Sequence, residues 1–213
     1  MATWRSCLAQ SLRWLKIKLK DVRIVLITIG LIGVLLFASP TISLFVKAPV
    51  GQEFSEIYIL SSNHTLNNLP FNIVANVNYL VYLGVVNQMG SSCYYTALVK
   101  VANTSNYLPN ATLEKPSTLP SLFEFNTFLS NGEAWETPLV FQVNQLAFTN
   151  GVSQLSSITI NGVTFPIDQT STWNSNNSGY YYYLFVELWL FNPTLGASQY
   201  NNRFVSLVLN MTQ

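Results

Sequence analysis

The stretch SITINGVTF, residues 157–165, decides the fold class of this chain. Two short runs with alternating apolar and polar residues flank Asn161 and Gly162. This pair suits a two-residue type I′ turn, which needs a positive φ at both of its positions. The pattern predicts a β-hairpin, and we therefore expect an antiparallel sheet in this part of the chain.

Similar runs recur on both sides of this hairpin. Each is rich in Val, Ile, Tyr, Phe or Leu and is bounded by Asn, Ser, Gly or Pro, as strands and turns require. The lack of helical periodicity between them predicts an all-β fold, an antiparallel Ig-like β-sandwich. The predicted strands are Phe54–Leu60, Phe71–Val77, Tyr79–Asn87, Cys93–Ala102, Leu122–Leu129, Leu139–Phe148, Leu155–Ile160, Val163–Ile167, Tyr180–Phe191 and Arg203–Met211.

The segment Tyr180–Phe191, YYYYLFVELWLF, is apolar on both faces, which is typical of a central strand covered on each side. Glu187 is its one charged residue, so we expect it to be paired or to point to an opening. The tyrosines at 180–183 are either core residues or exposed aromatics suited to protein and sugar contacts. The long connections Thr104–Pro120 and Gln169–Gly179 are candidates for functional or glycan-bearing loops.

A charge-free stretch, Ile24–Val46, precedes the predicted strands. As a helix it would reach about 34 Å, enough to cross a bilayer core of about 30 Å. The chain therefore divides into a basic cytoplasmic segment at 1–23, a transmembrane helix at 24–46 and an extracytoplasmic domain at 47–213. The leucine spacing of the basic segment also suits an amphipathic helix. A cleaved signal peptide is the alternative, but the length of the run and Pro40 favour an uncleaved signal-anchor.

The distribution of charge gives the orientation of this predicted span. Six of the ten Lys and Arg residues precede it and eight of the nine acidic residues follow it. Basic residues accumulate on the cytoplasmic flank, so the sequence predicts a single-pass cell-membrane protein with an extracellular C-terminal domain. The adjacent membrane leaflet already accounts for the positive charge of the basic segment, so we expect no nucleic-acid partner. Cys7 and Cys93 would lie on opposite sides, and we expect Cys93 to be a buried free thiol.

The sequence contains five Asn-x-Ser/Thr motifs, and every one follows the predicted span. This motif is the acceptor for N-linked glycans on extracellular surfaces. We expect glycans at two or more of the five. The candidate residues are Asn63, Asn103, Asn110, Asn176 and Asn210.

Catalytic motifs are weak in this sequence. His64 is the only histidine and stands in a polar turn, which is typical of solvated surface. One His and one outer Cys cannot assemble a common zinc site. A glycosidase-type carboxylate pair is the remaining option, although close acidic residues are also typical of solvated loops. We expect no enzyme activity, no cofactor and no metal site. The carboxylates considered are Glu53, Glu56, Glu124, Glu133, Glu136, Asp168 and Glu187.

Several segments resemble a known family: FSEIYIL (54–60), NLPFNI (68–73), GEAWETPL (132–139), INGVTF (160–165), and FVELWL with NRFVSL near the end. They are similar to the C-terminal extracytoplasmic domain of an archaeal, Sulfolobales-like family of membrane-anchored proteins of unknown function. The resemblance covers about residues 53–212 and implies an archaeal cell surface. It offers no catalytic residue to carry over. Members of the family often have several N-terminal spans, whereas this chain has one.

These patterns predict a membrane-anchored, N-glycosylated cell-surface protein. Its expected role is that of a non-catalytic interaction module or an accessory subunit of a membrane or envelope complex. The expected partners are membrane lipid, the N-linked glycans, and either a protein partner or further copies of the chain at the cell surface. A structural envelope or filament subunit, with strands paired between copies, is the alternative. A surface glycoside hydrolase is a third hypothesis.

Overall fold

The computed structural model describes residues 22–34 and 53–212, which belong to two units, 1–51 and 52–213. In the first unit, residues 22–34 form a helix with exposed apolar side chains. Among the described residues, no helix has both the length and the apolar character needed to cross a membrane. The basic segment through residue 21, with Cys7, and residues 35–46 of the predicted span lie outside the described part of the chain.

The second unit is built from ten strands, so the predicted all-β fold is confirmed. Each predicted strand is present, although several of the boundaries differ. A single 3-10 turn, Ser105–Tyr107, interrupts the connection between β4 and β5. The strands are β1 (Phe54–Ser61), β2 (Asn72–Val74), β3 (Asn78–Gln88), β4 (Cys93–Ala102), β5 (Phe123–Leu129), β6 (Ala134–Thr149), β7 (Val152–Ile160), β8 (Val163–Thr172), β9 (Tyr180–Asn192) and β10 (Ala197–Thr212).

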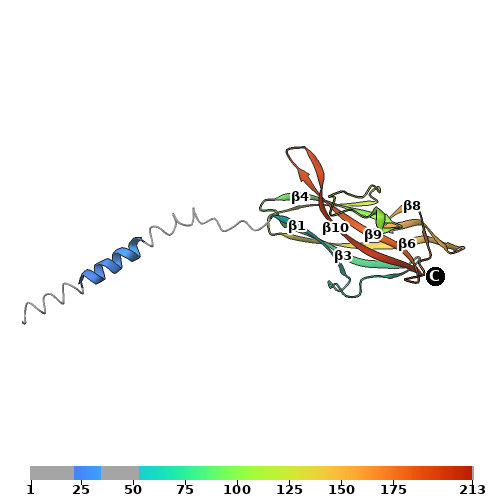
Figure 1. Cartoon of the computed structure of the whole chain (residues 1–213), viewed down its shortest axis with the longest axis horizontal. Coiled ribbons are helices and arrows are strands. Elements are labelled where there is room, and N and C mark those ends of the chain that lie inside the picture. The colour runs from blue at the N-terminus through green and yellow to red at the C-terminus, as the bar shows by residue number, and fades with distance from the viewer. Residues whose placement is uncertain (1–21, 35–52, 213) are drawn as a thin grey trace, which may run out of the picture. The chain divides into compact units, whose positions relative to one another are not determined.

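The strands form two five-stranded sheets that pack face to face. Sheet A has the order β1-β3-β6-β7-β8 and sheet B the order β2-β10-β9-β4-β5. The predicted turn at Asn161 and Gly162 joins β7 to β8, with φ values of 45° and 82°. Figure 1 shows that the C-terminus lies at the end of the sandwich opposite to the beginning of β1.

The prediction of a wholly antiparallel sandwich is wrong in one place, because β2 runs parallel to β10. The chain leaves sheet A after β1 and reaches the edge of sheet B, where Ile73 is fully buried opposite Met211. Burial of Ile73 fixes this short pairing. Hydrophobic periodicity identifies a strand but not its partner, so the sequence could not reveal a parallel edge.

Three further strand boundaries differ from those predicted from the sequence. Strand β8 continues to Thr172, so the predicted loop Gln169–Gly179 shrinks to residues 173–179. Strand β2 has three residues rather than the predicted seven, and β10 begins at Ala197, before a bulge at Asn201 and Asn202. The added parts of β8 and β10 are mostly polar, and they therefore carry little apolar signal in the sequence.

The core lies between the sheets, and two buried tyrosines cross it. The Tyr95 hydroxyl of sheet B lies 2.8 Å from Oγ of Ser55 and donates to Oδ1 of Asn87 at 3.0 Å, both in sheet A. The Tyr182 hydroxyl of sheet B donates to the carbonyl of Ser153 in sheet A at 2.9 Å. Tyr95 is near the beginning of β4 and Tyr182 near the beginning of the antiparallel β9. Each end of the sandwich therefore has its own polar link between the sheets.

The β4–β5 connection, residues 103–122, crosses the middle of the outer face of sheet B. Glu187 points outward from β9, as expected for a charged residue on an otherwise apolar strand, and it is fully buried under this connection. Its Oε1 accepts a hydrogen bond of 2.6 Å from the Ser117 backbone N–H. Its Oε2 forms an ion pair with Lys100 of β4, so of the two alternatives that the sequence offered for Glu187, the residue is paired. The connection leaves the two ends of this outer face uncovered.

Candidate functional site: an uncharged tyrosine groove

Two adjoining hollows lie on the outer face of sheet B, beside the beginning of β9. They have volumes of about 530 Å³ and 490 Å³, within the range typical of ligand sites. Asn174, Tyr181 and Tyr183 line both hollows, which we name together the tyrosine groove. The other lining residues are Phe71, Asn177 and Val208 of the first hollow and Asn103, Thr104, Ser105, Ser171, Thr172, Trp173 and Ser175 of the second.

The alternation of β9 places the tyrosines of this groove. Tyr182 points into the core, so Tyr181 and Tyr183 point outward, because successive side chains of a strand face opposite sides. Tyr183 pairs with Ala102 of β4 on one side and with Val208 of β10 on the other. Within the tyrosine run, Tyr182 is therefore a core residue, whereas Tyr181 and Tyr183 face outward and are half-buried rather than exposed.

The loop at residues 173–179 forms one wall of the groove. Oδ1 of Asn174 accepts hydrogen bonds from the backbone N–H groups of Asn176 at 3.0 Å and Asn177 at 3.2 Å, which closes a tight turn. The Tyr181 hydroxyl donates to the carbonyl of Asn177 at 2.6 Å. The Phe71 ring lies 6.2 Å from that of Tyr181, centroid to centroid. The shape of the groove is therefore fixed before any ligand arrives.

No acidic or basic side chain is among the residues that line the tyrosine groove. Its polar groups are amides and hydroxyls, and its broad surfaces are aromatic rings. Such a surface can bind an uncharged ligand through ring stacking and neutral hydrogen bonds. The lining contains no carboxylate and no histidine.

Five of the seven carboxylates considered from the sequence have separate partners. Glu133 accepts a hydrogen bond from the Ser130 N–H, Glu124 from the Ser121 hydroxyl and Asp168 from the Gln154 amide. Glu187 has the buried partners described above, while Glu53 and Glu56 are exposed. Within the described residues, no three His, Cys, Asp or Glu side chains form a group that could hold a metal ion.

His64 has a defined environment that its sequence context did not reveal. It lies in the turn after β1 with a φ of 54°, forms an ion pair with Glu136 of β6, and stacks on Tyr82 of β3 with a centroid separation of 3.9 Å. These contacts fasten the turn to the outer face of sheet A, opposite to the tyrosine groove. The imidazole is 53% exposed, as the sequence predicted, but it has a structural partner.

The five glycosylation candidates fall into two groups. Asn63, Asn110 and Asn176 are exposed residues of turns or loops. The other two are half-buried, and their side-chain amides are already bonded: Nδ2 of Asn103 donates to the carbonyl of Thr170 at 2.8 Å, and Nδ2 of Asn210 to Oδ1 of Asn72 at 3.0 Å. Asn103 and Asn176 lie at or beside the tyrosine groove, whereas Asn63 is next to His64.

Cys93 carries a free thiol at the beginning of β4. The sequence predicted a buried thiol, but the residue is only half-buried, because it stands at the end of the strand, where the core gives way to the turn at 89–92. Its Sγ lies 3.6 Å from the carbonyl oxygen of Ser91.

Comparisons with known proteins give a general likeness only. No family model and no curated protein matches the sequence. A CARDB domain from Pyrococcus furiosus, solved in complex with di-metal ions, aligns with a TM-score of 0.36 and 9% identity over 75% of this chain and 89% of that one. A β-glucosidase from Listeria innocua, in complex with glucose, aligns with a TM-score of 0.39 and 9% identity. That alignment covers 76% of this chain and 16% of the glucosidase. These values carry no inference about ligand or activity.

Proposed function

We propose that this protein is a membrane-anchored, N-glycosylated cell-surface protein whose outer domain is a non-catalytic interaction module. Its ligand is a neutral carbohydrate of the cell surface, which binds in the tyrosine groove. The observation that carries the proposal is the groove itself, where two outward tyrosines and a fixed asparagine turn form a lining without a single charged side chain.

The chemistry of this lining favours sugar over protein. Pyranose rings present apolar C–H faces that stack on aromatic rings, and their hydroxyls bond to amides and hydroxyls. Protein interfaces are also rich in aromatic residues, but they are enriched in arginine and methionine as well, and the lining of the groove contains neither. The groove contains one aliphatic side chain, Val208, and its rim is made of Asn, Ser and Thr. A neutral glycan therefore matches the polar groups present better than a protein surface does.

The N-terminal sequence supports the proposed anchor. The charge-free run Ile24–Val46 is long enough to span a bilayer. The described part of it belongs to the helix at residues 22–34, where Ile24, Ile27 and Leu31 each expose at least 60% of their surface. A helix that is apolar all round suits a lipid environment, and the basic residues before it favour a cytoplasmic N-terminus.

The position of the groove within the domain suits a surface receptor. The chain enters the sandwich at Phe54, and the groove lies at the opposite end, beside the beginning of the antiparallel β9. The 13 residues of β9 correspond to about 40 Å of strand. An anchor before β1 therefore leaves the groove at the far end of the domain, where a glycan can reach it.

A binding experiment on the full chain in mild detergent tests this proposal. The probes are the neutral hexasaccharides of an α-glucan, a β-glucan and an α-mannan, with a hexamer of galacturonic acid as the charged comparison. We expect calorimetric binding of at least one neutral probe, weakened tenfold or more by Tyr183→Ala and by Asn174→Ala. Tyr94→Ala is the matched control, since Tyr94 is an exposed tyrosine of the same face at the other end.

Two results would overturn the carbohydrate assignment. One is a lack of binding of all three neutral probes at millimolar concentration. The other is a protein subunit that co-purifies in stoichiometric amount from native membranes and is lost in Tyr183→Ala but not in Tyr94→Ala, because the groove would then be a protein interface. Extraction of the chain from membranes by alkaline carbonate would separately refute the membrane anchor.

A further inference from the structure

We propose that the end of the sandwich where β1 begins rests on the outer leaflet of the membrane. The contact consists of a row of three exposed aromatic side chains, Phe128, Tyr94 and Phe191, and the apolar tip of the β9–β10 hairpin. This inference rests on the membrane anchor proposed above, but not on the carbohydrate ligand. It assigns a lipid-binding surface to the end of the domain opposite to the tyrosine groove.

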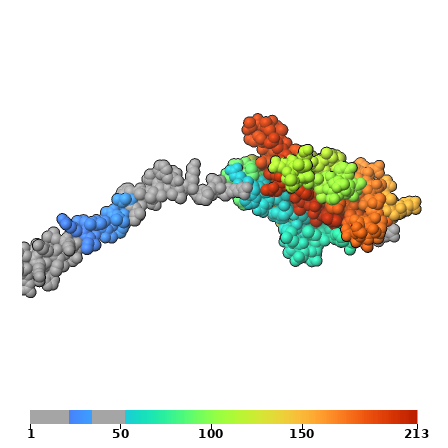
Figure 2. Space-filling view, in the orientation of Figure 1, coloured from blue at the N-terminus to red at the C-terminus, as the bar shows by residue number. Residues whose placement is uncertain are grey.

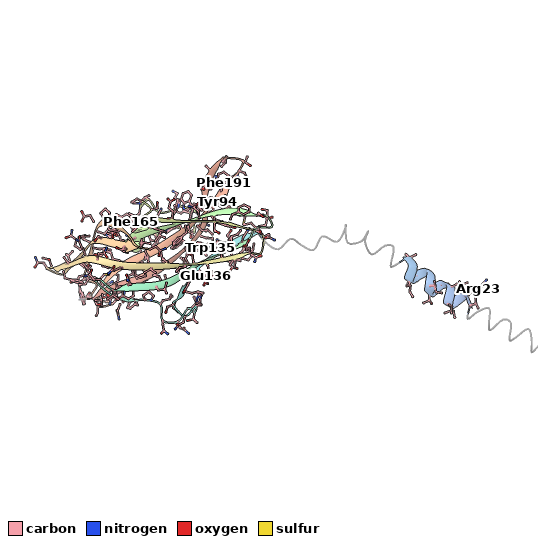
Figure 3. The ribbon with its side chains drawn as sticks, turned by 180° about the vertical axis from the view of Figure 1, so that it is seen from behind. Arg23, Tyr94, Trp135, Glu136, Phe165 and Phe191 are labelled. Carbon is pink, nitrogen blue, oxygen red and sulfur yellow. The ribbon has the colours of Figure 1, made fainter. Side chains whose placement is uncertain are left out.

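The aromatic row crosses three neighbouring strands of sheet B. Tyr94 of β4 pairs directly with Phe128 of β5. Tyr95 pairs with Leu190 of β9, so Phe191 occupies the next position beyond this pair. Their exposed fractions are 65% for Phe128, 41% for Tyr94 and 40% for Phe191. Figure 3 shows Tyr94 and Phe191 close to each other at this end of the domain.

The β9–β10 hairpin extends this apolar surface beyond the sheet. Figure 2 shows the hairpin projecting from the body of the domain. Its tip is held by Asn192, whose Oδ1 accepts from the Thr194 N–H at 3.0 Å and whose carbonyl accepts from the Leu195 N–H at 3.2 Å. Leu195 is 61% exposed, so an ordered turn holds a leucine in solvent. An exposed leucine beside exposed aromatics is typical of an interaction surface.

The charge pattern at this end of the domain indicates which lipid headgroups it would contact. Residues 188–202, LWLFNPTLGASQYNN, contain no charged side chain, and neither does the turn at 89–92. The acidic residues near this end are Glu53, just before β1, and Glu133, in the β5–β6 turn. These turns contain no lysine or arginine, and one exposed basic residue, Arg203, follows the hairpin segment and donates to the Asn202 carbonyl at 3.1 Å. Aromatic and leucine side chains with a single arginine and no basic cluster suit a zwitterionic interface rather than an anionic one.

The length of chain before β1 identifies the membrane as the occupant. Seven residues, 47–53, separate the end of the predicted span at Val46 from Phe54. Even fully extended, the eight steps from Val46 to Phe54 cover at most about 29 Å. The proposed anchor therefore confines this end of the domain to the vicinity of the bilayer surface. Aromatic side chains are enriched at that depth in membrane proteins, which matches the row found here.

Site-directed fluorescence on the full chain in phosphatidylcholine vesicles tests this inference. In a Cys7→Ser, Cys93→Ser background, an environment-sensitive fluorophore is placed on Leu195→Cys, and lipids carrying a nitroxide at the head of the acyl chain serve as quencher. The matched control is Thr149→Cys, an exposed position in β6 at the opposite end. We expect quenching of the Leu195→Cys label to exceed that of the Thr149→Cys label at least threefold.

A second variant separates lipid contact from proximity. Phe128→Ser combined with Phe191→Ser removes two members of the row without touching the core, and should reduce quenching at position 195 at least twofold. If the two labels are quenched equally on protein that floats with the vesicles, the proposed lipid contact is refuted, but the membrane anchor is not. Failure of the chain to float would refute the anchor and the inference together. The Leu195→Cys label could instead become more protected from solvent as the protein concentration rises, with no quenching by lipid. That result would show that this end of the domain contacts a second copy of the chain.

Discussion

The ammonium nitrogen of Lys100 lies 2.9 Å from Oε2 of Glu187, and both side chains are buried on the outer face of sheet B. The pair has further partners: the Lys100 ammonium donates to the carbonyl of Ser117 at 3.1 Å, and the indole N–H of Trp189 donates to Oε2 of Glu187 at 3.1 Å. Together with the Ser117 N–H, these bonds bind the β4–β5 connection to the sheet. The ion pair therefore has a structural role, because it holds the long β4–β5 connection on the sheet.

Removal of one member of this pair should be costly. Glu187→Ala leaves the Lys100 ammonium buried without a counter-charge, and breaking a buried pair in this way typically costs about 3–5 kcal/mol. Chemical denaturation of the full chain in detergent measures the loss. His64→Gln is the matched control, because the pair of His64 with Glu136 is partly exposed, with 53% and 28% of the two side chains accessible, and should contribute less than about 1 kcal/mol. Equal losses for the two variants would contradict the structural role of Glu187.

The two tyrosine links between the sheets should contribute independently. Tyr95→Phe leaves Ser55 and Oδ1 of Asn87 with fewer buried partners, and Tyr182→Phe does the same for the carbonyl of Ser153. Each change should cost about 1–3 kcal/mol. The sites lie at opposite ends of the sandwich, so the double variant should show the sum of the two losses. Tyr94→Phe, an exposed tyrosine beside Tyr95, should leave the free energy of unfolding unchanged.

Stability should fall at alkaline pH as tyrosines with a raised pKa ionise, among them Tyr95 and Tyr200. Burial raises the pKa of Tyr95 from its ordinary value of 10.0 to about 12, and burial with the nearby Glu187 carboxylate raises the pKa of Tyr200 to about 12. The folded state holds these protons more tightly than the unfolded state. Their contribution is therefore complete below about pH 10 and is lost as the pH rises through 12. Tyr95→Phe should flatten the slope of the unfolding free energy between pH 10 and 12. An unchanged slope would show that Tyr95 ionises normally.

Glycan occupancy should follow the two groups of asparagines. Asn63, Asn110 and Asn176 are exposed and should carry glycans, whereas Asn103 and Asn210 should not, because their amide nitrogens are held by Thr170 and Asn72. Peptide mass spectrometry of protein from the native host gives the occupancy at each position. Full modification of Asn210 would be incompatible with the bond between β10 and β2. A wholly unmodified protein would remove glycosylation from the proposed function.

Local signals predicted most of the fold. The bounds of β4, Cys93–Ala102, match the predicted strand, and the Asn161–Gly162 turn has the positive φ values that its residue types require. These features depend on neighbours in sequence. The polar continuation of β8 escaped prediction because Gln169 and Ser171 point inward at a sheet edge without adding apolar character. The parallel pairing of β2 escaped because no local pattern specifies which distant strand a short run will join.

The candidate site was harder to foresee than the fold. Sequence reasoning singled out the tyrosine run and the polar loop that ends at Gly179, and the groove uses both. It missed Phe71 and Val208, which reach Tyr181 and Tyr183 only because β10 lies between β2 and β9. Sequence reasoning also missed the pairing of His64 with Glu136, because the two residues are 72 positions apart. Groups brought together by strand order carry no signature in their own neighbourhoods.

Strand order also affects the synthesis of this protein. In sheet B the last of the described strands, β10, lies between β9 and β2, and Ile73 in β2 pairs with Met211. Residues 72–74 are therefore translated long before residues 210–212, the part of β10 with which they pair. On the proposed topology, sheet B is completed only after residues 210–212 have crossed to the outer side of the membrane. Without residues 210–212, strand β2 would have no partner, and this edge of sheet B would be open to surface proteases.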